Sequence, residues 1–302
     1  MLNHTSGNAI VLRAPFELAI TAEVARRLPS NILYPIHDGE LRLVMTLDDE
    51  VGLIGVRQTG PQSLIYRALS TTLSDARQAM VETNLRRLLG LDVDLASLEA
   101  LLASDLILGP LAQRLVGLRP PRFLSLWETF VQVIPFQQVS LAAAMTMVNH
   151  LTLAFGPRMR FESTEYLGAP ALEGVLHSAE VDLRACGLSA AKAAALRGCA
   201  EWLRAGKISE EELAGLSDEE AARRLCELPG IGPWSAQLIL LRGFGRLGIF
   251  PAGDSGATKG LLEVFAAAPD SVLASKEALA RLGAWRGYLY FMLLGRRRLG
   301  AG

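Results

Sequence analysis

The residue with the clearest chemical potential is Asp254, which follows the glycine- and proline-containing loop 250–253 and stands twenty residues after Trp234. A carboxylate can stabilise a positive charge that develops on a bound molecule, and it can orient a water. The simpler interpretation is that Asp254 caps a helix, because residues 255–265 have a helical pattern and aspartate is a favoured capping residue. What precedes Asp254 in the chain indicates whether a chemical role is expected.

A turn with two glycines lies just ahead of Trp234, in the stretch Leu228-Pro229-Gly230-Ile231-Gly232-Pro233. Residues 217–227 carry apolar side chains at helical spacing and residues 233–241 are apolar on most sides, so we expect two helices around this turn. Glycine permits a positive φ, and proline suits the first position of a helix. Such a turn presents N–H groups at a helix N-terminus and can bind a phosphate without a basic side chain. The same residues also fit a tight turn in any helical protein.

The order of this turn, the glycine- and proline-containing loop and Asp254 resembles the helix-hairpin-helix superfamily of DNA glycosylases. Two further segments, from Gly117 to Ser140 and from Gly283 to Tyr290, are similar to the bacterial 3-methyladenine-DNA glycosylase II branch of that superfamily. The resemblance covers residues 115–294. It implies a base-excision repair enzyme that flips a damaged base out of double-stranded DNA and hydrolyses its N-glycosidic bond.

The resemblance assigns roles to two polar residues. Asp254 would stabilise the positive charge that builds on the sugar as the base leaves. Gln138 would fill the gap that the flipped base leaves in the duplex, although the compared branch carries an apolar side chain there. The alternative for Gln138 is that it caps the helix beginning near Ser140.

The hairpin would contact the DNA backbone through Pro229, Gly230, Ile231, Gly232 and Ser235. On this interpretation Gly232→Ala strains the turn and weakens binding to all DNA alike. The resemblance also implies that the backbone carbonyls of Cys226, Leu228 and Ile231 hold a monovalent cation, Na⁺ or K⁺. No other cofactor is expected, and the three scattered cysteines argue against the iron-sulfur cluster that some relatives carry.

The substrate pocket is expected to contain Trp234, Phe136, Leu238 and Leu294. A cationic alkylated purine stacked on the indole of Trp234 would gain roughly 1 to 2 kcal/mol. Leu238 and Leu294 stand where the resemblance implies a tyrosine and a tryptophan. Phe136 can restore part of the aromatic pocket wall that these two leucines lack. The alternative is that Trp234 is an ordinary core residue.

Trp234 also occupies the position at which bifunctional relatives carry a lysine nucleophile. Without an amine there, no Schiff base with the sugar can form, so we expect a monofunctional enzyme. Lys259, in the helix after Asp254, is the nearest alternative amine. The expected substrates are 3-methyladenine and 7-methylguanine; deaminated or oxidised bases, and a DNA-damage-binding protein without catalysis, are the alternatives.

The charge of the chain is unevenly distributed. The net charge is −1, but residues 1–112 carry 9 Lys and Arg against 13 Asp and Glu, while residues 113–302 carry 21 against 18. The excess of basic residues in the second part suits a nucleic-acid binder. Three arginine clusters are candidate contacts to the DNA backbone, or alternatively solvated faces: Arg119 with Arg122, Arg242 with Arg246, and Arg296 with Arg297 and Arg298.

The pattern of apolar residues predicts two domains. Residues 1–112 form an α+β domain, with strands at 9–13, 17–20, 41–47 and 51–58 and a helix at 74–89; the resemblance implies that its fold is like half of a TATA-binding protein. Residues 113–302 form an all-α helix-hairpin-helix glycosylase domain. No apolar run approaches the roughly 20 residues of a bilayer span, and no signal peptide is visible. We therefore expect a protein of the cytoplasm, associated with the nucleoid in a bacterium. We also expect a monomer.

Overall fold

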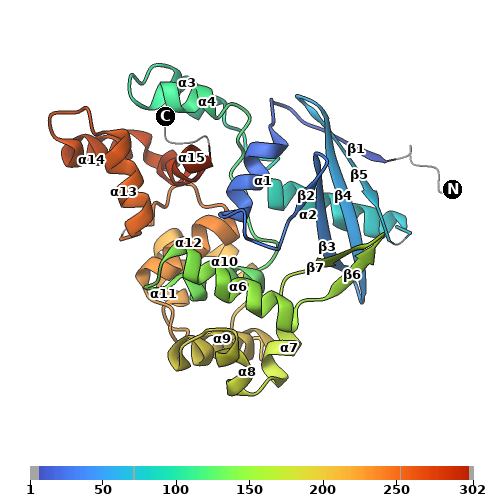
Figure 1. Cartoon of the computed structure of the whole chain (residues 1–302). Coiled ribbons are helices and arrows are strands. Elements are labelled where there is room, and N and C mark those ends of the chain that lie inside the picture. Colours follow the sequence, from blue (N-terminus) through green and yellow to red (C-terminus); the bar gives the residue numbers. More distant parts are fainter. Residues whose placement is uncertain (1–6, 71, 252, 299–302) are drawn as a thin grey trace.

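The computed structural model describes residues 7–70, 72–251 and 253–298 (Figure 1). An α+β unit at the N-terminal side is followed by a part built mainly of helices, which confirms the predicted fold class. Figure 1 shows the sheet on one side of the molecule and the helices from α9 onward on the other side.

The α+β unit is a five-stranded antiparallel sheet in the order β1-β5-β4-β3-β2. Its strands are β1 (Asn8–Val11), β2 (Ile36–His37), β3 (Glu40–Leu47), β4 (Glu50–Gly60) and β5 (Ser63–Ala68). Alternation along β3 buries Leu41, Leu43 and Met45 on one face. These side chains share a core with residues of α1 (Leu18–Arg26) and α2 (Asp75–Leu89), the two helices of this unit.

The helical part has a core of its own, centred on packing between α5 (Leu126–Val133) and α12 (Pro233–Phe244). Serine side chains cap several of its helices, as at Ser125 before α5 and Ser217 before α11. Its other helices are α3 (Ala96–Ala103), α4 (Leu108–Arg114), η1 (Ile134–Phe136), α6 (Leu141–Phe155), α7 (Leu172–His177), α8 (Glu180–Ala185), α9 (Ala190–Arg204), α10 (Glu210–Gly215), α11 (Asp218–Leu225), α13 (Ser255–Val264), α14 (Ser271–Leu282), η2 (Gly283–Trp285) and α15 (Arg286–Arg298).

Two local predictions were wrong. Residues 17–20, expected as a strand, belong to the start of α1, where the side chain of Glu17 accepts a hydrogen bond from the N–H of Ala19 and caps the helix. The second part is not all helical, because β6 (Arg158–Phe161) and β7 (Thr164–Leu167) form a hairpin beside β3. The boundary near residue 112 stays a prediction; α3 and α4, which precede it, contribute Leu98, Leu102 and Leu108 to the core of the helical part.

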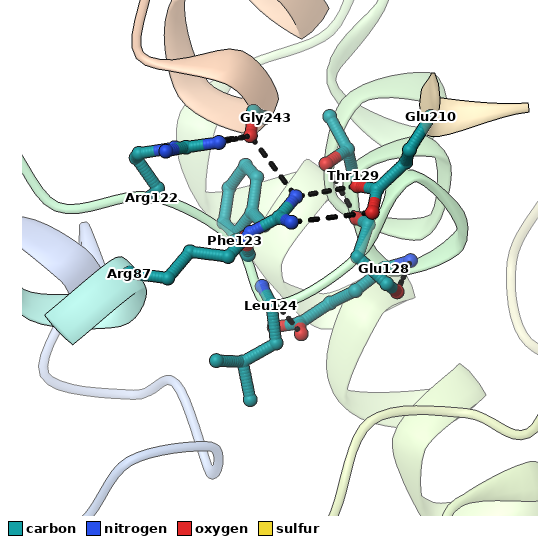
Figure 2. Close-up of polar contacts among 9 residues, drawn as sticks. Arg87, Arg122, Phe123, Leu124, Glu128, Thr129, Glu210 and Gly243 are labelled. Carbon is teal, nitrogen blue, oxygen red and sulfur yellow. Dashed lines mark hydrogen bonds and ion pairs between the residues drawn. The ribbon is translucent and has the colours of Figure 1, made fainter. Parts of the chain in front are cut away.

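The two parts are joined by a partly buried polar network around the end of α12 (Figure 2). Arg87 of α2 donates from Nε to the carbonyl of Phe123 at 2.8 Å and from Nη2 to that of Gly243 at 3.1 Å, and it pairs with Glu210. Arg122 also donates to the Gly243 carbonyl, from Nη2 at 2.9 Å. The network ties α12, which carries Trp234 at its other end, to the N-terminal unit.

The prediction that four arginines contact DNA was wrong, because these arginines bond to groups of the protein or are buried. Arg119 is buried and donates to the carbonyls of Val93 and Pro15, while Arg122 serves the network just described. Arg242 is 1% exposed, and Arg246 pairs with Asp218 at 2.9 Å. These guanidiniums satisfy carbonyl and carboxylate groups of the protein or lie inside it, so they are not free to bind phosphate.

Candidate active site

A cavity of about 800 Å³ lies where the hairpin, the segment before α6, and the starts of α9 and α13 meet α15. Predicted pocket and DNA-contact residues from distant parts of the sequence line it together: Phe136, Gln138, Gly230, Gly232, Trp234, Ser235, Leu238, Asp254 and Leu294. In the part of the chain that the structure describes, no group of three or more His, Cys, Asp or Glu side chains is placed to hold a metal ion, and no helix is long and apolar enough to cross a membrane.

Asp254 lies on the cavity wall as the N-cap residue just before α13. Its Oδ1 accepts a hydrogen bond from the N–H of Ala257 at 2.8 Å, so it caps the helix as its position in the sequence suggests. Its Oδ2 accepts from the indole Nε1 of Trp234 at 3.3 Å. Capping uses one oxygen, so the helix-cap role and a chemical role are compatible. The loop before Asp254 contains Ala252, which lies outside the described residues.

The hairpin differs from the prediction at one glycine. Gly230 has φ +73°, and a Cβ placed there would meet the Cβ of Ala195 at 2.5 Å, so this position requires glycine. Gly232 has φ −99° as the N-cap of α12, and a Cβ there would meet nothing within 4 Å. The expectation that Gly232→Ala strains the turn was therefore wrong. The position at which an alanine would strain the turn is Gly230.

A glutamine that the sequence did not single out joins the hairpin to the segment before α6. Gln137 donates from Nε2 to the carbonyl of Gly230 at 2.8 Å and to the hydroxyl of Ser235 at 3.0 Å. Ser235 is only 2% exposed, so its side chain holds this link rather than facing the hairpin surface. Pro229 and Gly230 are exposed there, whereas the side chain of Ile231 is buried.

Gln138 is exposed and has φ +54°, in the left-handed region that non-glycine residues rarely adopt. It does not cap α6, because the hydroxyl of Ser140 accepts the hydrogen bond from Ala143 N–H at 3.2 Å. Its side chain makes no hydrogen bond to any described residue. A long polar side chain thus stands at the cavity rim on a strained backbone, which is typical of functional segments.

On the cavity wall, Phe136 and Leu294 are half-buried, whereas Leu238 is 1% exposed and belongs mainly to the core. Tyr290 lines the same space from α15. Lys192, at the start of α9, donates from Nζ to the carbonyl of Pro135 at 2.9 Å, and partial burial lowers the pKa of its amine. The cavity wall therefore contains an amine that sequence spacing did not identify.

Two ionisable side chains of α5 and α12, Glu128 and Arg242, are buried. Glu128 accepts a hydrogen bond from the N–H of Leu124 at 3.1 Å (Figure 2). It accepts a second one from the hydroxyl of Tyr34. Burial raises the pKa of Glu128 to about 7. Burial, followed by the charge of Arg27, lowers the pKa of Arg242 to about 9, and this guanidinium lies 4.7 Å from the centroid of Phe123.

Among functional candidates, the sequence missed Arg27, Gln137 and Lys192. Gln137 stands next to the predicted plug residue, so the paired glutamines gave a partial signal. Arg27 and Lys192 lie outside every motif and reach the cavity only through folding.

The chain is similar to several known proteins. Residues 33–125 match the AlkA N-terminal domain family. The chain is 23% identical over 257 residues to the DNA-3-methyladenine glycosylase of Bacillus subtilis, covering 84% of this chain and 85% of that protein. It is 29% identical over 259 residues to the probable bifunctional transcriptional activator/DNA repair enzyme AlkA of Mycobacterium tuberculosis, covering 84% of this chain but 49% of that protein.

A solved structure, the 3-methyladenine DNA-glycosylase of Archaeoglobus fulgidus, superposes with a TM-score of 0.81 at 23% identity, covering 98% of this chain and all of that one. Together with the sequence matches, this likeness confirms the predicted resemblance: the chain has the fold of the AlkA-like helix-hairpin-helix DNA glycosylases.

Proposed function

We propose, from this fold and the cavity around Asp254, that the chain is a monofunctional DNA glycosylase that releases alkylated purines, such as 3-methyladenine and 7-methylguanine, from double-stranded DNA. The observation that carries the proposal is the placement of Asp254. Its carboxylate is held by two hydrogen bonds, from Ala257 and from Trp234, on the wall of a cavity large enough for a flipped base.

The mechanism follows from what lies around that carboxylate. The bond between C1′ of the sugar and the base breaks, and the base leaves with the bonding electron pair. Positive charge builds on the sugar, and Asp254, fixed in place before the reaction, stabilises it. Water adds its oxygen to C1′ and gives up a proton, which Asp254 can accept and pass to solvent. The product is an intact strand with an abasic site.

The surfaces around the cavity support binding of duplex DNA. The turn, exposed at Pro229 and Gly230, can approach a phosphate through the backbone N–H groups of Gly230 and Gly232. Gln138 stands at the cavity rim, where it can enter the space vacated by the base.

We include a monovalent cation in the proposal. The carbonyls of Cys226, Leu228 and Ile231 belong to the turn after α11, and such hard oxygen donors suit Na⁺ or K⁺. The Leu228 carbonyl accepts a hydrogen bond from Ile231 N–H at 3.2 Å, and a carbonyl has a second lone pair for a cation. A bound cation would add positive charge where the hairpin meets phosphate.

The test is base release from a panel of duplexes, each with one lesion, by the wild-type protein and by Asp254→Asn. The asparagine keeps the helix cap but lacks the charge, so release should fall by about a hundredfold or more. Binding to DNA that carries an abasic site should change little. Near-normal turnover by Asp254→Asn would exclude the assigned role, and release of no base from any lesion by the wild-type protein would exclude the function.

A further inference from the structure

Arg27 brings a buried positive charge to the cavity wall from the N-terminal unit. It follows α1 directly, is only 6% exposed and lines the cavity. Its guanidinium carbon lies 4.3 Å from the ring centroid of Phe136 and 5.9 Å from that of Phe123. The charge is therefore stacked on an aromatic ring that itself lines the cavity.

The hydrogen bonds of this guanidinium are incomplete. Nη1 donates to the carbonyl of Gln132 at 3.4 Å, but Nε and Nη2 are buried and have no partner among the described residues. The backbone of Arg27 is also strained, with φ +64° and ψ −42°. Buried unpaired donors and a strained backbone both cost free energy, so a side chain kept there calls for a functional explanation.

The charges along the cavity wall set Arg27 apart. Three described cations, Arg27, Lys192 and Arg297, line the cavity, and Asp254 is the one described carboxylate that does. Arg297 is exposed and Lys192 partly exposed, so solvent and salt weaken their fields. The field of Arg27 is screened much less because the group is buried.

A buried cation affects neutral and cationic lesions differently. A neutral base leaves with the electron pair of the glycosidic bond and develops negative charge, which a nearby guanidinium stabilises in the transition state. A cationic base, such as N7-methylated guanine, leaves as a neutral molecule, and its initial charge is repelled by Arg27.

We propose that Arg27 is a specificity-determining residue that biases the pocket toward neutral damaged bases, including deaminated purines. This proposal rests on the proposed glycosylase function: cationic alkylated purines leave as neutral molecules and need less stabilisation from the protein, and Arg27 extends the substrates to neutral damaged bases.

The experiment compares single-turnover release of hypoxanthine, a neutral base, and 7-methylguanine, a cationic lesion in DNA. Both purines carry a carbonyl at position 6, so the comparison reports mainly on charge. Arg27→Gln removes the charge, Arg27→Lys keeps it, and Arg26→Gln removes the charge of a neighbour that does not line the cavity. We expect Arg27→Gln to lower the ratio of hypoxanthine to 7-methylguanine rates at least tenfold. The other two variants should stay within threefold of the wild-type ratio.

Equal losses on both lesions in Arg27→Gln would make Arg27 a structural residue and overturn the inference while leaving the proposed function intact. Release of neither lesion by the wild-type protein would instead overturn both. The wild-type protein also gives a result that needs no folded variant: its rate enhancement over spontaneous loss should be at least tenfold greater for hypoxanthine than for 7-methylguanine. An equal or smaller enhancement for hypoxanthine would refute the bias.

Discussion

The indole N–H of Trp234 donates to Oδ2 of Asp254 at 3.3 Å, while Oδ1 of the same carboxylate accepts from the N–H of Ala257 at 2.8 Å. Two helices therefore hold the two oxygens, α12 through a side chain and α13 through its backbone. The hairpin, which the sequence associates with phosphate binding, thus also orients the acid in the cavity. We therefore expect Trp234 to position Asp254, in addition to offering a surface on which a base can stack.

Trp234→Phe tests the positioning role, because phenylalanine keeps an aromatic face and removes the N–H. A hydrogen bond to a charged group contributes roughly 1.5 to 3 kcal/mol, so we expect the single-turnover rate to fall at least about tenfold. The loss should be similar for neutral and cationic lesions, because the carboxylate acts on the sugar in both. Trp234→Ala should lose additional activity on cationic purines, where stacking contributes most. A full rate in Trp234→Phe would show that the indole N–H does not position the acid.

The two hairpin glycines should respond differently to alanine. Gly230→Ala places a Cβ 2.5 Å from that of Ala195 and forces a side chain into a positive φ, so the turn must shift. We expect its affinity for damaged, undamaged and abasic duplexes to fall together, by about tenfold, in a fluorescence anisotropy titration. Gly232→Ala is the matched control, since its Cβ meets open space at φ −99°. If Gly232→Ala weakened DNA binding as much as Gly230→Ala, backbone strain would not be the cause.

The sequence identified the hairpin, Trp234 and Asp254 because local spacing determines their arrangement: a turn, the helix after it and the cap of the following helix. It did not identify Arg27, whose approach to Phe136 depends on packing between the N-terminal unit and the helical part. It also misassigned Arg119 and Arg242, because a charge pattern cannot distinguish an exposed guanidinium from one that bonds to protein groups or lies buried. Helices with strong apolar periodicity were predicted well, whereas the short β6–β7 hairpin has too few residues to give a periodic signal.

A monofunctional enzyme should leave the DNA strand intact. After incubation with a lesion-containing duplex, the strand should break only after hot alkali, and borohydride should trap no covalent complex between protein and DNA. The reason is that Trp234 stands in place of an amine nucleophile, while the Nζ of Lys192 is engaged with the carbonyl of Pro135 at 2.9 Å. A trapped complex that persists in Lys259→Ala but disappears in Lys192→Ala would instead make Lys192 the nucleophile and the enzyme bifunctional.

Glu128 should make the stability of the fold depend on pH. Burial raises its pKa from the ordinary 4.5 to about 7 in the folded protein. Between these two pH values, the folded state keeps a proton that the unfolded state releases. This contribution to stability is fully present below pH 4.5, declines as pH rises, and is lost above pH 7. By linkage the loss amounts to roughly 3 kcal/mol. Glu128→Gln, which resembles the protonated acid, should flatten this decline between pH 4.5 and 7 in urea unfolding followed by circular dichroism.

The control for Glu128 is the exposed glutamate Glu211, whose replacement by glutamine should leave the decline unchanged. Glu128→Gln should also be more stable than the wild-type protein at pH 8, because an amide can keep the bond from Leu124 N–H without a buried charge. The positive charge of Arg242 opposes this gain in stability, because it stabilises the ionised form of Glu128 and so lowers the pKa of that carboxyl. A variant that is less stable than wild type at pH 8 and keeps the same slope would mean that Glu128 is ionised in the folded state and paired with Arg242.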